Sequence, residues 1–200
     1  MKNKTVFVDI DTQFDFMHPE GTFYVPNAED IIDNVERLFD YAKVHKIKIL
    51  SSIDAHRIDD PEFQHFPSHC VKDTPGNKKI EATTCKDSIV IENKGQHISE
   101  TILNHEQIIV EKQSFDIFDN INADKIVINL DVSDYVVFGV ATDYCIKAAV
   151  LGLIRRGYKV SLVTDAVKAA TQEGETEALD EMRDAGVVFV STQDVIERKR

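Results

Sequence analysis

Cys145 is a candidate nucleophile because of the sequence around it. Residues 135–140 form an apolar run typical of a buried strand, and a short turn, 141–144, separates this run from a segment with helical periodicity. The apolar face of that segment consists of Ile146, Ala149, Val150 and Leu153. With Thr142 as N-cap, the helix would carry Cys145 in its first turn, where free N–H groups and the positive helix end lower a thiol's pKa. A small cysteine buried in the core is the alternative interpretation.

Charged residues follow two other apolar runs. Asp11 lies in the acidic stretch 9–16 directly after the first run, and Lys112 stands where the run that begins at residue 108 ends. Asp11 could supply the general base that a cysteine nucleophile needs, although turn-capping carboxylates are common in such loops. A lysine that points into the cleft would favour both the thiolate of Cys145 and the carboxylate of Asp11, whereas a solvated strand end is the simpler alternative.

A third group of residues could hold a metal ion. Asp54 and His56 alternate along an extended segment, so their side chains point the same way, and His69 follows in the sequence. One carboxylate and two imidazoles leave positions open on a divalent metal for a substrate. Glu62 and His65 are close enough in sequence to support such a site. Because the chain contains seven histidines, chance proximity is the alternative.

The elements that must position these residues are predicted by short β-branched runs separated by helix-like segments. This alternation predicts an α/β fold with a mainly parallel, Rossmann-like sheet of about six strands, whose carboxyl edge would carry the site. We expect one helix over residues 31–42 with Asn27 as N-cap, and a last helix from near Thr171 to Gly186. Residues 56–106 are expected to form loops. The apolar runs are 6–8, 47–50, 108–110, 136–138, 160–163 and 187–190.

Composition limits the classes of protein that remain. A chain of 200 residues with 42% hydrophobic content is expected to form a single domain, 1–200. The formal net charge of −12 argues against nucleic acid as a partner, and no apolar stretch is long enough to span a membrane. The amino terminus lacks a signal-peptide pattern, and three widely spaced cysteines do not suggest a disulfide framework. We therefore expect a cytoplasmic protein that acts on a small molecule.

These pieces together resemble the cysteine hydrolases of the isochorismatase-like superfamily, in particular its nicotinamidase branch. The segment 11–16 is similar to the family motif Asp-x-Gln-x-Asp-Phe, and 139–145 is similar to the nucleophile turn Gly-x-Ala-Thr-Asp-x-Cys. Lys112 stands at the position of the catalytic lysine, while 54–56 and 67–71 are similar to the metal-binding Asp-x-His and His-Cys-Val segments. The resemblance implies a three-layer αβα fold and a bound metal, zinc by preference, with iron and manganese as alternatives.

The resemblance also implies a mechanism for hydrolysis of nicotinamide to nicotinic acid and ammonia. Asp11 would act as general acid and base, Lys112 would stabilise charge, and Cys145 would form a thioester with the substrate. The N–H groups of Ala141 and Cys145 would form the oxyanion hole beside a cis peptide between Val140 and Ala141. A metal held by Asp54, His56 and His69 would orient the pyridine ring between Phe16 and Phe66.

Several positions depart from the family pattern and leave alternatives open. Asp73 stands where relatives commonly have glycine, Phe66 where tryptophan is frequent, and 113–118 differs from the glycine- and tyrosine-rich version of some nicotinamidases. Residues 77–106 contain no motif of the family. The alternatives are a related hydrolase acting on another amide or carbamoyl compound, a non-catalytic binding module, and a thiol redox protein. Metal identity and a homo-oligomeric state stay open.

Overall fold

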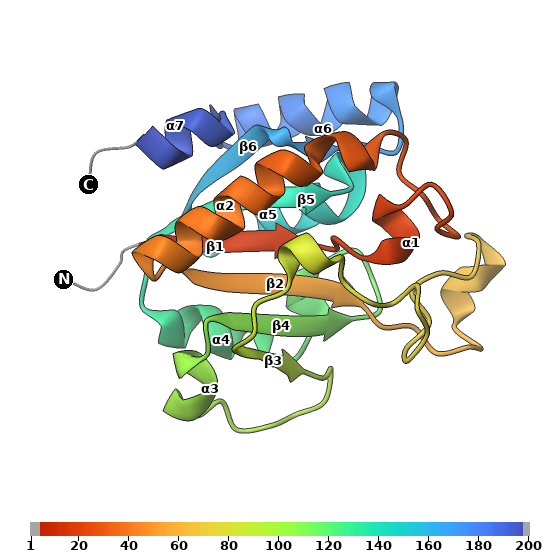
Figure 1. Cartoon of the computed structure of the whole chain (residues 1–200), viewed down its shortest axis with the longest axis horizontal. Helices are drawn as coiled ribbons and strands as arrows, with labels where there is room; N and C mark the ends of the chain where they lie inside the picture. Colours follow the sequence, from red (N-terminus) through yellow and green to blue (C-terminus); the bar gives the residue numbers. More distant parts are fainter. Residues whose placement is uncertain (1–4, 198–200) are drawn as a thin grey trace.

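A seven-stranded sheet forms the centre of the protein. The computed structural model describes residues 5–197, and the sheet has the strand order β3-β4-β2-β1-β5-β6-β7 with every neighbouring pair parallel (Figure 1). The strands are β1 (Thr5–Ile10), β2 (Lys48–Asp54), β3 (Ser88–Ile91), β4 (Gln107–Lys112), β5 (Asp134–Val140), β6 (Lys159–Lys168) and β7 (Val188–Val190). The predicted α/β fold with a parallel sheet is confirmed, with one strand more than expected.

The additional strand is β3, which lies within residues that the sequence predicted to be loops. It has only four residues, and Val90 is 48% exposed because β3 is an edge strand that pairs on one side with β4. A run this short and half exposed lacks the continuous apolar character of the central strands. The rest of residues 56–106 contains short 3-10 turns and one helix of five residues.

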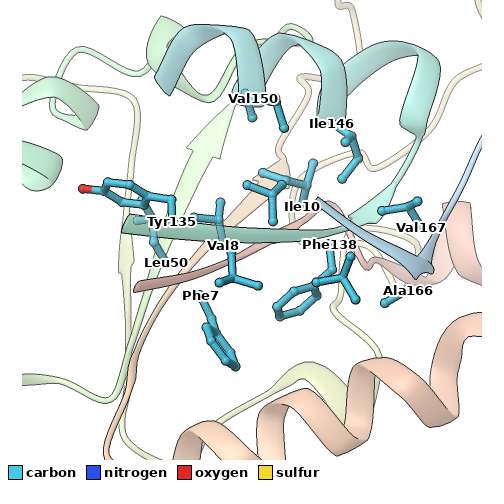
Figure 2. Packing of buried hydrophobic residues seen from close by; sticks show 14 of the residues in the cluster. Phe7, Val8, Ile10, Leu50, Tyr135, Phe138, Ile146, Val150, Ala166 and Val167 are labelled. Atoms are coloured by element: carbon cyan, nitrogen blue, oxygen red, sulfur yellow. The ribbon is translucent and has the colours of Figure 1, made fainter. Parts of the chain in front are cut away.

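Helices cover both faces of the sheet. Phe138 of β5 packs on one face against Phe39 of a long helix, with ring centroids 6.0 Å apart. On the other face, Ile146 and Val150 lie over the same strands (Figure 2). The helices are α1 (Phe14–Met17), α2 (Ile32–His45), α3 (Glu100–Asn104), α4 (Ala123–Leu130), α5 (Lys147–Arg155), α6 (Gln172–Asp184) and α7 (Thr192–Glu197). Phe39 belongs to α2 and Val150 to α5, so the strands are sandwiched between helices in an αβα arrangement.

Two details of the predicted helices differ from the structure. Asn27 is not an N-cap: it adopts a left-handed conformation without a side-chain cap, and a 3-10 turn (Ala28–Ile31) precedes α2. Thr171 does cap α6, since its hydroxyl accepts a hydrogen bond from Gly174 N at 3.0 Å. However, α6 is not the last helix, because α7 follows β7.

Close packing between β1 and β5 explains a glycine in the middle of the site-bearing segment. Gly139 has φ of +118°, and a Cβ atom there would lie 2.1 Å from the carbonyl oxygen of Ile10. Only glycine allows the two strands to approach this closely. Within residues 5–197, no helix is both long and apolar enough to cross a membrane.

Candidate active site

Four neighbouring strands deliver the candidate residues to the same edge of the sheet. Asp11 directly follows β1, Asp54 ends β2, Lys112 ends β4, and Cys145 comes five residues after β5. Asp54 and Lys112 are register partners in the β2–β4 pair. The carboxyl ends of these strands point toward the side of the molecule where α1 lies (Figure 1). The candidate residues therefore lie together at the carboxyl ends of the strands, the place where the sequence predicted the site.

Lys112 is the centre of a buried charged cluster. Its ammonium nitrogen lies 2.8 Å from Asp11 Oδ2 and 3.5 Å from Cys145 Sγ, and it also contacts Asp54 Oδ1. The lysine is fully buried, so it is not the solvated strand end that was the alternative. The hydroxyl of Ser52 donates a hydrogen bond of 2.6 Å to Asp11 Oδ1. A base, a cation and a thiol are therefore in direct contact.

The acidities of these groups differ from the sequence-based expectation. Burial raises the pKa of the Cys145 thiol well above its ordinary value, and the nearby carboxylates act in the same direction, whereas Lys112 opposes them. The predicted lowering of the pKa by a helix end is wrong, because Cys145 is only 6% exposed. Burial also raises the pKa of Asp11, against the opposing charge of Lys112. A thiol of this kind needs a base to become a nucleophile, and Asp11 is in place to serve as one.

The turn that carries Cys145 is not the predicted helix start. Residues Thr142–Ile146 form a π turn, and α5 begins only at Lys147. Thr142 does not cap a helix, since its hydroxyl oxygen is buried without a hydrogen-bond partner. The carbonyl of Ala141 instead accepts hydrogen bonds from Tyr144 N and Ile146 N, each 3.1 Å long. The Val140–Ala141 peptide is cis, as the resemblance implied.

Asp143 ties this turn to the start of α6. Its carboxylate accepts hydrogen bonds from Ala170 N at 2.9 Å and Thr171 N at 3.2 Å. The sequence did not identify this role, because the partners are backbone atoms 27 and 28 residues away.

The predicted metal ligands Asp54, His56 and His69 lie together in a group that could hold a metal ion, named here the metal-binding group. Their ligand atoms lie within 4.8 Å of one another, with His56 Nε2 and His69 Nε2 at 3.7 and 3.8 Å from Asp54 Oδ2. His56 Nε2 is buried and has no hydrogen-bond partner, which is the environment expected of a metal ligand. His69 uses Nδ1 to contact the Pro67 carbonyl at 2.7 Å, which leaves its Nε2 available. This set of donors fits a divalent metal such as zinc.

Asp54 connects the metal-binding group to the charged cluster. Burial alone would raise its pKa, but Lys112, His56 and His69 outweigh burial and lower the pKa below its ordinary value. One carboxylate oxygen faces the lysine and the other faces the two imidazoles. Of the two supporting residues suggested by the sequence, Glu62 lies near His56, whereas His65 is exposed.

Gln13 fixes the backbone of Asp54. Its side chain accepts a hydrogen bond from Asp54 N at 2.7 Å and donates to Asp54 O at 2.8 Å and Asn77 O at 2.7 Å. The sequence placed Gln13 in a motif but gave it no role, because its partners are main-chain atoms far along the chain. Loss of the Gln13 side chain would free the end of β2, which carries the Asp54 carboxylate.

Asp15 likewise fixes the backbone of the loop that carries His69. Its carboxylate accepts hydrogen bonds from Cys70 N at 2.7 Å and Thr22 N at 3.1 Å. A Cβ atom on Gly76 would lie 2.1 Å from the Asp15 carboxylate, so only glycine fits there. In the same loop, Asp73 has φ of +67°, a conformation that glycine adopts more readily than other residues.

An aromatic cavity opens beside Cys145. It encloses about 490 Å³, a volume that includes the open solvent at its mouth. Phe16 and Phe66, the two predicted ring contacts, both line it together with Ala141. Four further aromatic residues, to which the sequence gave no role, also line the cavity: Phe23, Tyr24, Phe115 and Tyr144. Phe23 is close to both predicted rings, with centroids 6.1 Å from Phe16 and 5.5 Å from Phe66.

The chain is similar to known proteins over most of its length. A family model described as the isochorismatase domain matches residues 5–194. The chain is 26% identical to the nicotinamidase of Escherichia coli over 92% of this chain and 93% of that protein. It is 25% identical to a probable inactive nicotinamidase of Arabidopsis thaliana over 92% of this chain and 90% of that protein. The zinc complex of the pyrazinamidase of Pyrococcus horikoshii superposes with a TM-score of 0.78 at 27% identity, covering 94% of this chain and 99% of that one.

Proposed function

Because the chain belongs to the isochorismatase domain family, we propose that it is a nicotinamidase-type amidohydrolase that converts nicotinamide to nicotinic acid and ammonia. The observation that carries this proposal is the contact between Asp11, Lys112 and Cys145 beside an aromatic cavity. The nicotinamidase of E. coli and the pyrazinamidase of P. horikoshii support it, since their names describe hydrolysis of flat heteroaromatic amides.

In the proposed reaction, Asp11 accepts the thiol proton of Cys145, and the sulfur attacks the carboxamide carbon. Lys112 stabilises the charges that develop, because it contacts both groups. The N–H groups of Ala141 and Cys145 donate to the tetrahedral oxyanion. Asp11 then transfers its proton to the leaving nitrogen, and ammonia departs.

The second half of the reaction uses the same carboxylate. A thioester remains on Cys145, and Asp11 takes a proton from water as that water attacks the acyl carbon. Nicotinic acid is released, and the proton returns to the sulfur. The raised pKa of Asp11 suits a group that must act alternately as base and acid.

Substrate orientation is assigned to the metal-binding group and the aromatic walls. Asp54, His56 and His69 would hold a divalent metal, with zinc suggested by the P. horikoshii complex. When bound, the metal would supply a Lewis-acidic position for the ring nitrogen of the substrate. Phe16 and Phe66 would contact the faces of the ring, which places its carboxamide toward Cys145.

Ammonia release from nicotinamide tests this function. We expect turnover by the purified protein, loss of turnover in Cys145→Ala, and full turnover in Cys85→Ala, a control cysteine that does not line the cavity. Mass spectrometry of the wild-type protein quenched during turnover should show an acyl adduct on Cys145. Chelator treatment should reduce activity, and added Zn²⁺ should restore it.

Two results would contradict the proposal. Turnover retained in Cys145→Ala would exclude the cysteine as nucleophile. No ammonia from the zinc-loaded wild type would exclude nicotinamide, and a panel of carbamoyl and other amide substrates would then separate a different hydrolase from an inactive relative.

A further inference from the structure

We propose that Asp60 is a positioning residue, which fixes the orientation and tautomer of His56 so that its Nε2 faces the metal. The inference rests on the metal-binding group of the proposed function and adds a residue that no sequence motif identified. It starts from the position of Asp60, whose Oδ2 lies 3.1 Å from His56 Nδ1. The imidazole is fully buried and the carboxylate is 12% exposed, so water competes little for this contact.

The two carboxylate oxygens of Asp60 have separate partners. Oδ1 accepts a hydrogen bond of 3.0 Å from Glu62 N and caps the 3-10 turn Pro61–Gln64. Capping therefore uses only one oxygen and leaves Oδ2 free for His56. A residue that served only as a cap would not need its second oxygen near a buried imidazole.

His69 supports this assignment because its ring has the same arrangement. Its Nδ1 lies 2.7 Å from the carbonyl oxygen of Pro67, which can only accept a hydrogen bond. In the neutral ring the proton is then on Nδ1, and the lone pair is on Nε2. An ionised carboxylate is likewise only an acceptor, so Asp60 selects the same tautomer for His56. Both Nε2 atoms then face Asp54 Oδ2, at 3.7 and 3.8 Å.

The state of the His56 ring shows why such a partner matters. Both of its nitrogens are buried without a well-aligned hydrogen bond. A metal at Nε2 and Asp60 at Nδ1 would satisfy both nitrogens at once. Hydrogen bonds that metal-bound histidines donate to carboxylates typically strengthen metal binding 10- to 100-fold.

Zinc affinity of the Asp60→Asn variant tests the inference. The amide oxygen can still accept from Glu62 N, while the NH₂ group would face His56 Nδ1 and favour the wrong tautomer. We expect about 10- to 100-fold weaker Zn²⁺ binding, measured by competition with a chromogenic chelator on the metal-free full chain. Asp59→Asn is the matched control, because Asp59 pairs with the exposed Arg57. The Zn²⁺ affinity of this variant should equal that of the wild type.

A second variant separates positioning from folding. Asp60→Ser keeps a good capping residue but is too short to reach His56, so it should also bind Zn²⁺ more weakly while its melting temperature stays close to that of the wild type. The ¹⁵N shifts of His56, measured at a pH at which the ring is neutral, give an independent measure: Nε2 should be unprotonated in the metal-free wild type and protonated in Asp60→Asn.

The outcomes distinguish this inference from the proposed function. Unchanged Zn²⁺ affinity in both Asp60 variants would overturn the inference alone. A wild-type protein that binds no Zn²⁺ would refute the metal role in the proposed function and the inference with it. Loss of a second equivalent of Zn²⁺ in the variants would also overturn it, because Asp60 would then be a ligand itself, in the group with His56 and Glu62.

Discussion

Replacement of Lys112 by methionine should destabilise the protein strongly at neutral pH and weakly in acid. Methionine has a similar length and fills the same space, so the main loss is the positive charge. Lys112 is fully buried against the carboxylates of Asp11 and Asp54. Without it, at least one of these carboxyls must take up a proton in the folded state, because two like charges cannot both stay ionised in a buried cluster.

The size of the destabilisation can be calculated from the carboxyl that takes up this proton. A carboxyl that stays protonated at pH 7, against a pKa of about 3.9 in the unfolded chain, costs about 4 kcal/mol. This agrees with the ~3–5 kcal/mol typical of breaking a buried ion pair. The folded variant binds more protons than its unfolded state above about pH 4, so its free energy of unfolding falls as pH rises. The deficit relative to the wild type should therefore be small near pH 4 and largest near pH 7.

Urea unfolding of both proteins between pH 4.5 and 7.5, with a chelator present, measures this difference. The double variant Lys112→Met/Asp11→Asn should recover most of the lost stability, because it removes one of the unpaired carboxylates. Lys79→Met serves for comparison with Lys112→Met, because Lys79 pairs with a single buried carboxylate. That carboxylate, of Asp9, also accepts a hydrogen bond from the Ser51 hydroxyl. Equal stabilities of Lys112→Met and wild type at pH 7, or parallel pH profiles, would refute this account of the charged cluster.

Two further predictions concern the same region. Burial raises the pKa of Asp11, so the acid limb of the kcat/KM profile should lie above pH 3.8 in the wild type. Ser52→Ala removes a hydrogen bond that lowers this pKa, so the acid limb should move to higher pH. An unmoved limb in a pH–rate profile would argue against Asp11 as the base. Gly139→Ala should cost about 3 kcal/mol or more in urea unfolding, because its Cβ would meet Ile10 O at 2.1 Å. The control Gly157→Ala, where φ is also positive but nothing lies within 4 Å, should cost only about 1 kcal/mol.

Much of the fold could be predicted from the chain because its signals are local. The central strands are continuous β-branched runs, since both of their faces are covered by helices. The edge strand β3 escaped prediction because a short strand with an exposed face leaves little apolar pattern. The start of α2 was misplaced for a similar reason, because a 3-10 turn and an α-helix begin with the same residue types.

The candidate site likewise has features that the sequence predicted and features that it could not predict. The sequence by itself predicted Asp11, Lys112, Cys145 and the metal-binding group as candidate residues, because each stands directly after an apolar run or in a segment similar to a motif of the family. Only the tertiary structure brought them into contact and decided their acidity. The pKa of a thiol depends on how deeply it is buried and which charges surround it, and neither quantity is encoded near Cys145 in the chain.

The supporting residues were likewise decided by the tertiary structure. Gln13 and Asp15 bind main-chain atoms of residues 41 and 55 positions away, and any polar side chain can bind a backbone group without leaving a pattern in the sequence. Asp60 is close to His56 in sequence, yet its contact with the ring depends on how the 3-10 turn folds back. The types and order of the reactive residues were therefore set by the sequence, whereas their distances, their burial and the groups that hold them came from packing between distant segments.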